Sequence, residues 1–327
     1  MDLKSGTQLI KRYRGTVGKG ARNELLLILY ETSVNFKIYC SLLVLGRIQN
    51  KVSADRESRI ANLRFFDTVH PSKRLTDHDH RYGAAGMRIV VLSDIHGNLT
   101  AFEAVLADVQ RAAPDTVFHG GDLSDGGSSP VEIIDQIRDL GWHGVMGNGD
   151  EMLHRPEALE EFAAQSSAPS QLWTSVREMA EATRSMLGSS RLSWLSQLPS
   201  VLLEPDLGIV HASPHTSWKA APPHASDEEL GRIYSSLGKA LVVFGHTHLP
   251  FIRKTSVIPE LLVNTGSVGL PYDGDPRASY LMLDGDVPSI RRVEYDLDKE
   301  LKRLSSSTLP HADWTARMLR SSSPQLP

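Results

Sequence analysis

Five short segments of the chain carry side chains that commonly bind divalent metal ions. Each segment follows a run of apolar residues predicted to be a β-strand, and open α/β sheets place their ligand sites at such strand ends. All the candidate donors are oxygen or nitrogen atoms, which suit Mn, Fe, Zn, Co or Ni. The candidate metal ligands are Asp94, His96, Asp122, Asn148, His211, His246 and His248.

Taken singly, most of these segments have a simpler explanation. Asp94 could cap a following helix, and Asn148 begins an Asn-Gly pair of the kind favoured in hairpin turns. A lone histidine such as His211 is more often structural than a ligand, and the most specific element is the pair His246 and His248. Because a non-functional interpretation needs five coincidences at five strand ends, the set as a whole favours a metal site.

The number of candidate ligands indicates two metal ions rather than one. Zinc usually takes four ligands, so two Asp, one Asn and four His are too many for a single ion. Two divalent cations would exceed the charge of the two carboxylates, and a phosphate group is the natural guest of such a positive site. Two ions about 3.5 to 4 Å apart can activate a water molecule and hold the phosphoryl oxygens.

The order Asp-x-His, Gly-Asp, Gly-Asn-x-Asp, His and Gly-His-x-His resembles the calcineurin-like metallophosphoesterase superfamily over about residues 87–298. Residues 264–269 and 273–280 resemble elements of its small prokaryotic phosphodiesterase branch. The resemblance implies an α/β fold, a four-layer αββα sandwich of two mixed β-sheets flanked by helices, with a small α-rich insertion.

The resemblance also implies how the ligands divide between two divalent metal ions. One ion would be held by Asp94, His96, Asp122 and His248, and the other by Asp122, Asn148, His211 and His246, so that Asp122 bridges them. Asp150 is expected to orient its neighbours from outside the metal ligands.

The sequence departs from the family at Gly149, where many members have a histidine thought to protonate the leaving group, and in a smaller way at Thr265, where the branch usually has proline. Loss of that acid should disfavour substrates with poor leaving groups. His215 is a candidate substitute, or simply a surface histidine, and His119 and His154 are weaker candidates. Arg277 could contact a phosphate or could serve the turn that contains it.

These features predict a two-metal phosphoesterase that hydrolyses a phosphodiester, or an activated phosphomonoester, by attack of a metal-bridging hydroxide. The alternatives within enzymes are a dinucleoside polyphosphate hydrolase and a Ser/Thr protein phosphatase. The alternative outside enzymes is a scaffold or binding protein that keeps the fold. The expected partner is a small phosphate ester, because the helical insertion is expected to cover the site as a cap.

The elements that must position these residues follow from hydrophobic periodicity. Short strands at 88–92, 116–118 and 144–146 alternate with helices at 100–111 and 130–140, and this alternation predicts a parallel sheet. The chain then becomes helical at 157–198, resumes short strands at 200–203, 208–210 and 240–244 around a helix near 227–237, and continues as strand and turn at 252–293, as a second sheet would. From residue 305, Ser and Pro become frequent and order is expected to fade, although 314–319 could dock as one helical turn.

Composition places the chain among globular proteins and divides it into unequal parts. Of 327 residues, 40% are hydrophobic and 23% charged. Residues 1–86 carry 15 Lys and Arg against 8 Asp and Glu, whereas residues 87–327 carry 20 against 31. The basic charges are scattered, so nucleic acid is not an expected partner. We predict a poorly ordered extension at 1–86, a catalytic domain at 87–304 with a helical cap at 156–199, and a tail at 305–327.

The remaining composition bears on location. A single cysteine, Cys40, excludes an internal disulfide. Neither a continuous apolar span nor a secretory signal is indicated. We therefore expect a cytoplasmic protein with no membrane partner, and the sequence leaves its oligomeric state open.

Overall fold

The computed structural model describes residues 9–16, 22–29, 86–222 and 224–327, which belong to two separate units, 1–78 and 79–327. In the first unit, strands β1 (Leu9–Thr16) and β2 (Arg22–Leu29) pair antiparallel, with Leu9 opposite Leu29. Most of the extension predicted at 1–86 lies outside the described residues, so its lack of order stays a prediction.

The first sheet of the second unit has the strand order β12-β11-β3-β4-β5. Strands β3 (Arg88–Leu92), β4 (Thr116–His119) and β5 (His143–Gly144) run parallel. They are connected by helices α1 (Leu99–Ala112) and α2 (Pro130–Leu140), as the βαβαβ pattern predicts. Strand β11 (Ala278–Asp284) pairs antiparallel with β3, and β12 (Val287–Val293) pairs with β11.

The second sheet has the strand order β6-β7-β8-β10-β9. Its members are β6 (Val201–Leu203), β7 (Leu207–Val210), β8 (Leu241–Phe244), β9 (Phe251–Lys254) and β10 (Leu261–Asn264). Helix α6 (Asp227–Tyr234) and a 3₁₀ turn, η1 (Ser235–Leu237), lie between β7 and β8 in the chain. The expectation that 252–293 would form one second sheet is therefore wrong in part, because β11 and β12 return to the first sheet.

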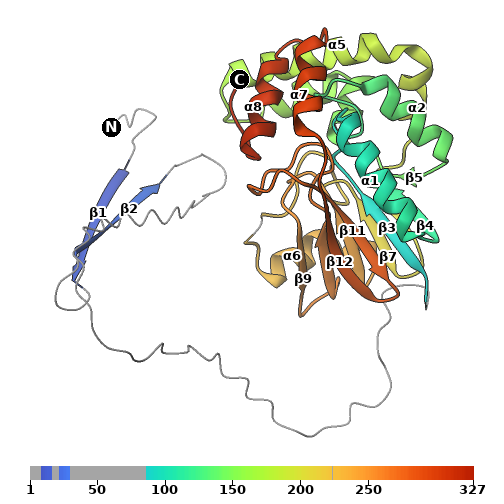
Figure 1. Cartoon of the computed structure of the whole chain (residues 1–327). Helices are drawn as coiled ribbons and strands as arrows, with labels where there is room; N and C mark the ends of the chain where they lie inside the picture. Colours follow the sequence, from blue (N-terminus) through green and yellow to red (C-terminus); the bar gives the residue numbers. More distant parts are fainter. Residues whose placement is uncertain (1–8, 17–21, 30–85, 223) are drawn as a thin grey trace, which may run out of the picture. The chain divides into compact units, whose positions relative to one another are not determined.

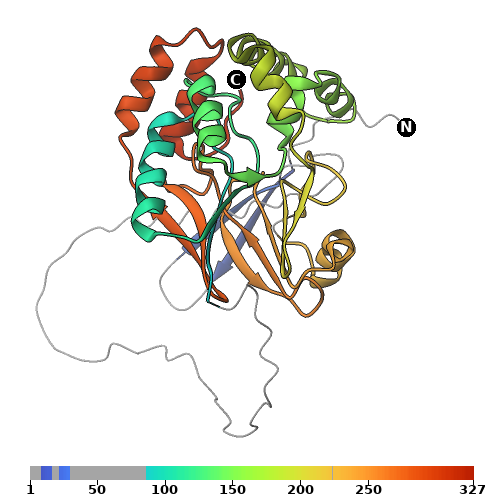
Figure 2. The same ribbon diagram turned by 90° about the vertical axis from the view of Figure 1, so that its right-hand side faces the viewer.

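The two sheets pack face to face, and helices cover their outer faces (Figures 1 and 2). Successive side chains of β3 point to opposite faces of the first sheet, so this strand packs against a layer on each side. Val91 packs among the residues between the sheets, with Ile209 and Val243 of the second sheet. Val90 packs with Phe102 of α1 in the layer behind the first sheet. The predicted four-layer αββα sandwich of two mixed sheets is thus confirmed.

The segment after β5 is helical, as predicted. It comprises α3 (Asn148–His154), α4 (Glu157–Ala163) and α5 (Ser170–Leu195), which is kinked at Gly188. Helix α5 contacts α2, α3 and α4, so the insertion is anchored to the first sheet's helices. No helix among the described residues is long and apolar enough to cross a membrane.

The end of the chain differs from the sequence expectation. Residues 297–306 and 312–321 form α7 (Leu297–Ser306) and α8 (Ala312–Ser321). Trp314, Met318 and Leu319 are buried and pack with Met179 of α5 and with Leu270, which lies outside that helix. The docking of residues 314–319 is thus confirmed, in a helix longer than the single turn expected, whereas order does not fade from residue 305.

Candidate metal centre

The candidate ligands follow the carboxyl ends of strands in both sheets. Asp94, Asp122 and Asn148 come after β3, β4 and β5 of the first sheet, and Asn148 is the first residue of α3. His211 follows β7, and the segment with His246 and His248 follows β8. Because the two sheets pack face to face, residues distant in the chain are brought to one place.

The backbone at these strand ends is strained. Eight non-glycine residues in the described part of the chain have a positive φ, and five of them are candidate ligands: Asp94, His96, Asp122, His246 and His248. A residue with a side chain that holds such a conformation costs about 1 to 3 kcal/mol, and it persists where the surroundings over-determine it. These loops form left-handed turns and not extended segments, and the turns bring the five side chains together.

Asp94, His96 and His248 form one cluster of donor atoms. The three ligand atoms lie within 4.8 Å of one another. His96 Nε2 is 3.2 Å from His248 Nε2, and His248 Nε2 is 3.2 Å from Asp94 Oδ1. Asp122 Oδ2 lies 3.7 Å from His96 Nε2, at the edge of this cluster.

Asp122, His211 and His246 form the second cluster. His211 Nε2 is 3.4 Å from Asp122 Oδ2 and 3.2 Å from His246 Nδ1. The amide oxygen of Asn148 is 2.8 Å from His246 Nδ1 and 3.0 Å from His211 Nε2. Since the same oxygen of Asp122 faces His96 and His211, this carboxylate lies between the two clusters.

Hydrogen bonds behind the rings fix which nitrogen faces inward. His211 Nδ1 is 2.8 Å from the carbonyl oxygen of Gly120, and His248 Nδ1 is 2.5 Å from that of Leu270. A carbonyl only accepts, so we infer that each Nδ1 carries a proton. In a neutral ring the inward Nε2 then holds a lone pair, the form that binds a metal ion.

This donor set fits divalent metal ions. Lone pairs that face each other at 3.2 Å repel unless a cation or a proton lies between them. Metal–nitrogen bonds of about 2.0 to 2.1 Å place neighbouring ligand atoms about 3.0 to 3.4 Å apart, close to the separations found here. Reversing the Asn148 amide would let its NH₂ donate to both rings, so the need for a cation rests on the contacts among His96, His248 and Asp94.

The pKa values of the candidate ligands also indicate that the centre favours positive charge. Burial alone would lower the pKa of His96 and of His211. Asp125 and Asp122 outweigh it at His96 and raise its pKa to about 10, and Asp122 and Asp94 raise that of His211 to about 9. Burial and the nearby His211 instead lower the pKa of His246 to about 4. Burial opposes ionisation of Asp122 as well, but His211 and His96 hold the pKa of this carboxyl below its usual range.

Asp150 lies outside both clusters and holds the backbone around them. Its carboxylate accepts hydrogen bonds from the backbone N–H groups of Asp122 at 2.8 Å, Leu123 at 3.0 Å and Gly147 at 3.0 Å. Burial and the charge of Asp122 raise the pKa of Asp150 to about 7. It thus ties the loop after β4 to the loop after β5.

Sequence reasoning missed Asp125. His96 Nδ1 faces this residue, at 3.2 Å from its carboxylate and 3.1 Å from its carbonyl oxygen. The same carboxylate fills the space beside Gly149, where a Cβ would lie only 2.8 Å from Asp125 Oδ2 and closer still to Oδ1. The signal was present as a second aspartate three residues after Asp122, but its partners are set by packing and not by spacing.

Tyr272 was missed as well. Its ring stacks on His248, with centroids 4.3 Å apart at 17°, and its hydroxyl points to Met318 of α8. The C-terminal helices therefore support one wall of the centre. No local motif around Tyr272 signals this contact.

The candidate proton donors lie in different places. His215 is exposed beside Pro214. His154 Nε2 is 3.3 Å from Met146 Sδ. His119 is fully buried, neither ring nitrogen has a hydrogen-bond partner, and burial followed by His143 lowers its pKa to about 3. Arg277 forms a 2.7 Å ion pair with Asp275 in an exposed turn, so neither His119 nor Arg277 joins the centre.

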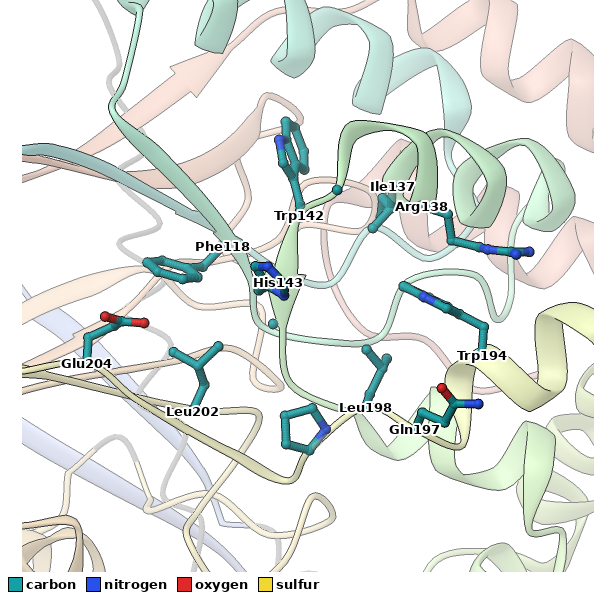
Figure 3. Close-up of a pocket in the computed structure, with 13 residues that line it drawn as sticks. Phe118, Ile137, Arg138, Trp142, His143, Trp194, Gln197, Leu198, Leu202 and Glu204 are labelled. Carbon is teal, nitrogen blue, oxygen red and sulfur yellow. The ribbon is translucent and has the colours of Figure 1, made fainter.

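Two of the hollows in the described surface of this unit lie near elements already named. One, of about 400 Å³, lies between the edges of the two sheets and is lined by Phe118, Trp142, Trp194 and Leu202 (Figure 3). The other, of about 500 Å³, lies between α3, α4 and the loop after β7. None of the seven candidate ligands lines either hollow, but the second is bounded by residues adjacent to them in the chain.

Comparison with known proteins identifies the family of this chain. A family model described as the calcineurin-like phosphoesterase superfamily domain matches residues 87–286. Similar proteins include the uncharacterized protein MJ0912 of Methanocaldococcus jannaschii, 31% identical over 252 residues that cover 71% of this chain and 96% of that protein. Phosphodiesterase YfcE of Escherichia coli K12 is 28% identical over 219 residues, 62% of this chain and 91% of its own. A crystal structure of a metallophosphoesterase from Sphaerobacter thermophilus is 25% identical with a TM-score of 0.59, and the match covers 72% of this chain and 99% of that one.

Proposed function

The chain belongs to the calcineurin-like phosphoesterase superfamily, and from this premise we propose that it is a two-metal phosphodiesterase. Its family and its similarity to phosphodiesterases of the small prokaryotic branch make it a hydrolase of phosphoric esters that uses divalent metal ions. The number of ions, the preference for diesters and the residue roles are our proposal. The observation that carries it is the pair of donor clusters with Asp122 between them.

We assign Asp94, His96 and His248 to one ion and Asn148, His211 and His246 to the other, with Asp122 bridging. Two bound divalent ions would lower the pKa of a water molecule towards neutrality and neutralise the phosphoryl oxygens of the substrate. Nitrogen and oxygen donors suit Mn, Fe, Zn, Co or Ni.

The chain's own residues set the geometry on which this chemistry depends. Asp125 orients His96 through Nδ1, and the Gly149 N–H donates to Asp122 Oδ1 at 2.7 Å, which leaves Oδ2 to face both clusters. Asp150 holds the two loops together through three backbone N–H groups. Orientation of ligands by such contacts commonly changes metal affinity about 10- to 100-fold.

The groups that could protonate the leaving group determine which esters the site favours. Gly149 offers no side chain at the position where many family members have a histidine, and Asp125 fills the adjacent space. A departing group of low basicity needs no proton. The arrangement therefore favours diesters and monoesters with good leaving groups, and exposed His215, which lines the hollow beside α3, is the remaining candidate donor.

The test uses the purified full chain loaded with Mn²⁺. We expect about two metal ions per chain and faster hydrolysis of bis(p-nitrophenyl) phosphate than of p-nitrophenyl phosphate. Asp122→Ala should lose both metal and hydrolysis, whereas Asp286→Ala, in an exposed turn, should lose neither. Two ions per chain without hydrolysis of either ester would instead indicate a binding protein.

A further inference from the structure

The hollow beside α3 is lined by residues that lie close in the chain to two proposed metal ligands, Asn148 and His211. One wall runs along α3, where Glu151 and Arg155 lie one and two turns beyond Asn148. The other wall is the loop that follows His211, including Pro214 and Ser217. The two walls approach each other near Asn148, where one terminal atom of the Asn148 amide lies 3.3 Å from the carbonyl oxygen of Ser217 and would donate to it if the amide were reversed.

The hollow contains an aromatic wall contributed by two separate segments. Phe162 of α4 packs against Trp218 of the loop, with ring centroids 4.9 Å apart at 31°. Trp173 of α5 meets Phe162 edge-on at 5.6 Å and 83°. Both Phe162 and Trp218 line the hollow and remain partly exposed.

Hydrogen bonds hold the aromatic wall in place. The Trp218 Nε1–H donates to Glu151 Oε2 at 2.9 Å, and the Ser217 hydroxyl donates to the same oxygen at 2.7 Å. The partly buried Glu151 also pairs with Arg155 at 2.5 Å. A ring surface fixed in this way loses little conformational freedom when a second ring stacks on it.

The charges around the hollow favour an uncharged guest. Arg155 is paired with both Glu151 and Glu161, at 2.5 and 3.1 Å. Lys219 Nζ lies 5.8 Å from the centroid of the Phe162 ring. Two carboxylates thus balance two cations, and among the lining residues a second phosphate group would meet only Lys219 and the imidazole of His215.

We propose that this hollow is a specificity pocket that stacks an aromatic ester group of the phosphodiester on Phe162 and Trp218. The proposal rests on the proposed function, since the phosphate would be held at the metal centre next to Asn148. An aryl group and a nucleobase share the flat ring that the pocket would recognise. Where a base stacks on an aromatic side chain, replacing that side chain by alanine commonly lowers the binding affinity about 5- to 100-fold.

The experiment compares phosphates that differ only in their organic group. Binding of methyl phosphate, phenyl phosphate and thymidine 5′-phosphate to the Mn²⁺-loaded full chain is measured by calorimetry. We expect phenyl phosphate or thymidine phosphate to bind at least 5-fold more tightly than methyl phosphate, and the tighter of the two identifies the ring. Phe162→Ala and the milder Phe162→Leu should bring this ratio close to one and leave binding of methyl phosphate unchanged. Trp194→Leu, in the hollow between the sheet edges, should preserve the ratio.

The outcomes separate the pocket from the proposed function. A ratio near one in the wild-type chain, or a ratio that survives Phe162→Leu in a folded variant, overturns the pocket. Hydrolysis of bis(p-nitrophenyl) phosphate is measured on the same samples. If hydrolysis proceeds while the ratio is one, the function stands and the pocket fails. If rings are preferred but no ester is hydrolysed, the pocket stands and the function fails.

Discussion

Adding a methyl group at Gly149 tests how the centre is packed. Gly149 lies in the first turn of α3, and its φ is not in the left-handed region, so alanine would be tolerated by the backbone. In an open helix this change would stabilise the protein by about 1 kcal/mol. Here the new Cβ would overlap the carboxylate of Asp125, and overpacking of this kind costs about 1 to 3 kcal/mol.

The overlap should be relieved by movement of Asp125, which would take a carboxylate away from His96 Nδ1. Loss of such an orienting contact typically weakens metal binding about 10- to 100-fold. We therefore expect Gly149→Ala to raise the dissociation constant for Mn²⁺ by about 10-fold. Asp125→Ala should do the same, because it removes the carboxylate directly and leaves only the backbone carbonyl oxygen beside His96 Nδ1.

The double variant distinguishes this mechanism from two independent defects. If Gly149→Ala acts by displacing Asp125, then Gly149→Ala/Asp125→Ala should bind Mn²⁺ about as well as Asp125→Ala alone. Independent effects would multiply to about 100-fold, so the expected coupling is about 1.4 kcal/mol. Competition with a fluorescent chelator measures each constant. Gly208→Ala, where the nearest atoms would be at an ordinary 3.4 Å, is the control. A 100-fold loss in the double variant, or no loss in Gly149→Ala, would refute the reasoning.

Two further predictions concern stability and domain limits. His119 has a folded pKa of about 3 against 6.5 in the unfolded chain, so the unfolded chain binds the proton more tightly and the free energy of unfolding falls as pH drops below 6.5. Between pH 7 and 5 this amounts to about 2 kcal/mol. His119→Leu should remove that loss in urea titrations with chelator present, whereas His224→Gln, at an exposed histidine, should retain it. Equal pH dependence in all three proteins would contradict this. A shortened chain that begins at Met87 should keep its metal content and its hydrolysis, because β3 begins at Arg88 and every proposed ligand follows it; loss of either would show that residues 1–86 contribute to the centre.

The positions of the proposed ligands were predictable because each depends on a local pattern. A run such as residues 88–92 marks a buried strand, and the polar residue that follows it must lie at the end of a sheet. The parallel order of β3, β4 and β5 follows from the helices between them. These inferences need only short-range periodicity, and together they place Asp94, Asp122 and Asn148 at one edge.

The contacts that hold the centre together were not predictable in the same way. Asp125 meets Gly149 and His96 through packing between separate loops, and Tyr272 reaches His248 across more than twenty residues of chain. Strand β11 pairs with β3, almost 200 residues earlier, and nothing in its own sequence says which sheet it joins. The positive φ values at Asp94 and His96 arise from the hydrogen bonds of their loops to the backbone of Gly121 and Asp122.

Net charge adds a separate argument for diesters. Residues 87–327 carry 31 acidic against 20 basic residues, so the body around the centre is strongly acidic. A doubly charged monoester or a polyphosphate is repelled more strongly by such a body than a singly charged diester, although salt weakens the effect beyond about 8 Å. The hollow beside the centre is balanced in charge and lined by rings, and Gly149 offers no acid. Long-range field and pocket therefore favour the same substrate, a monoanionic diester with an aromatic group.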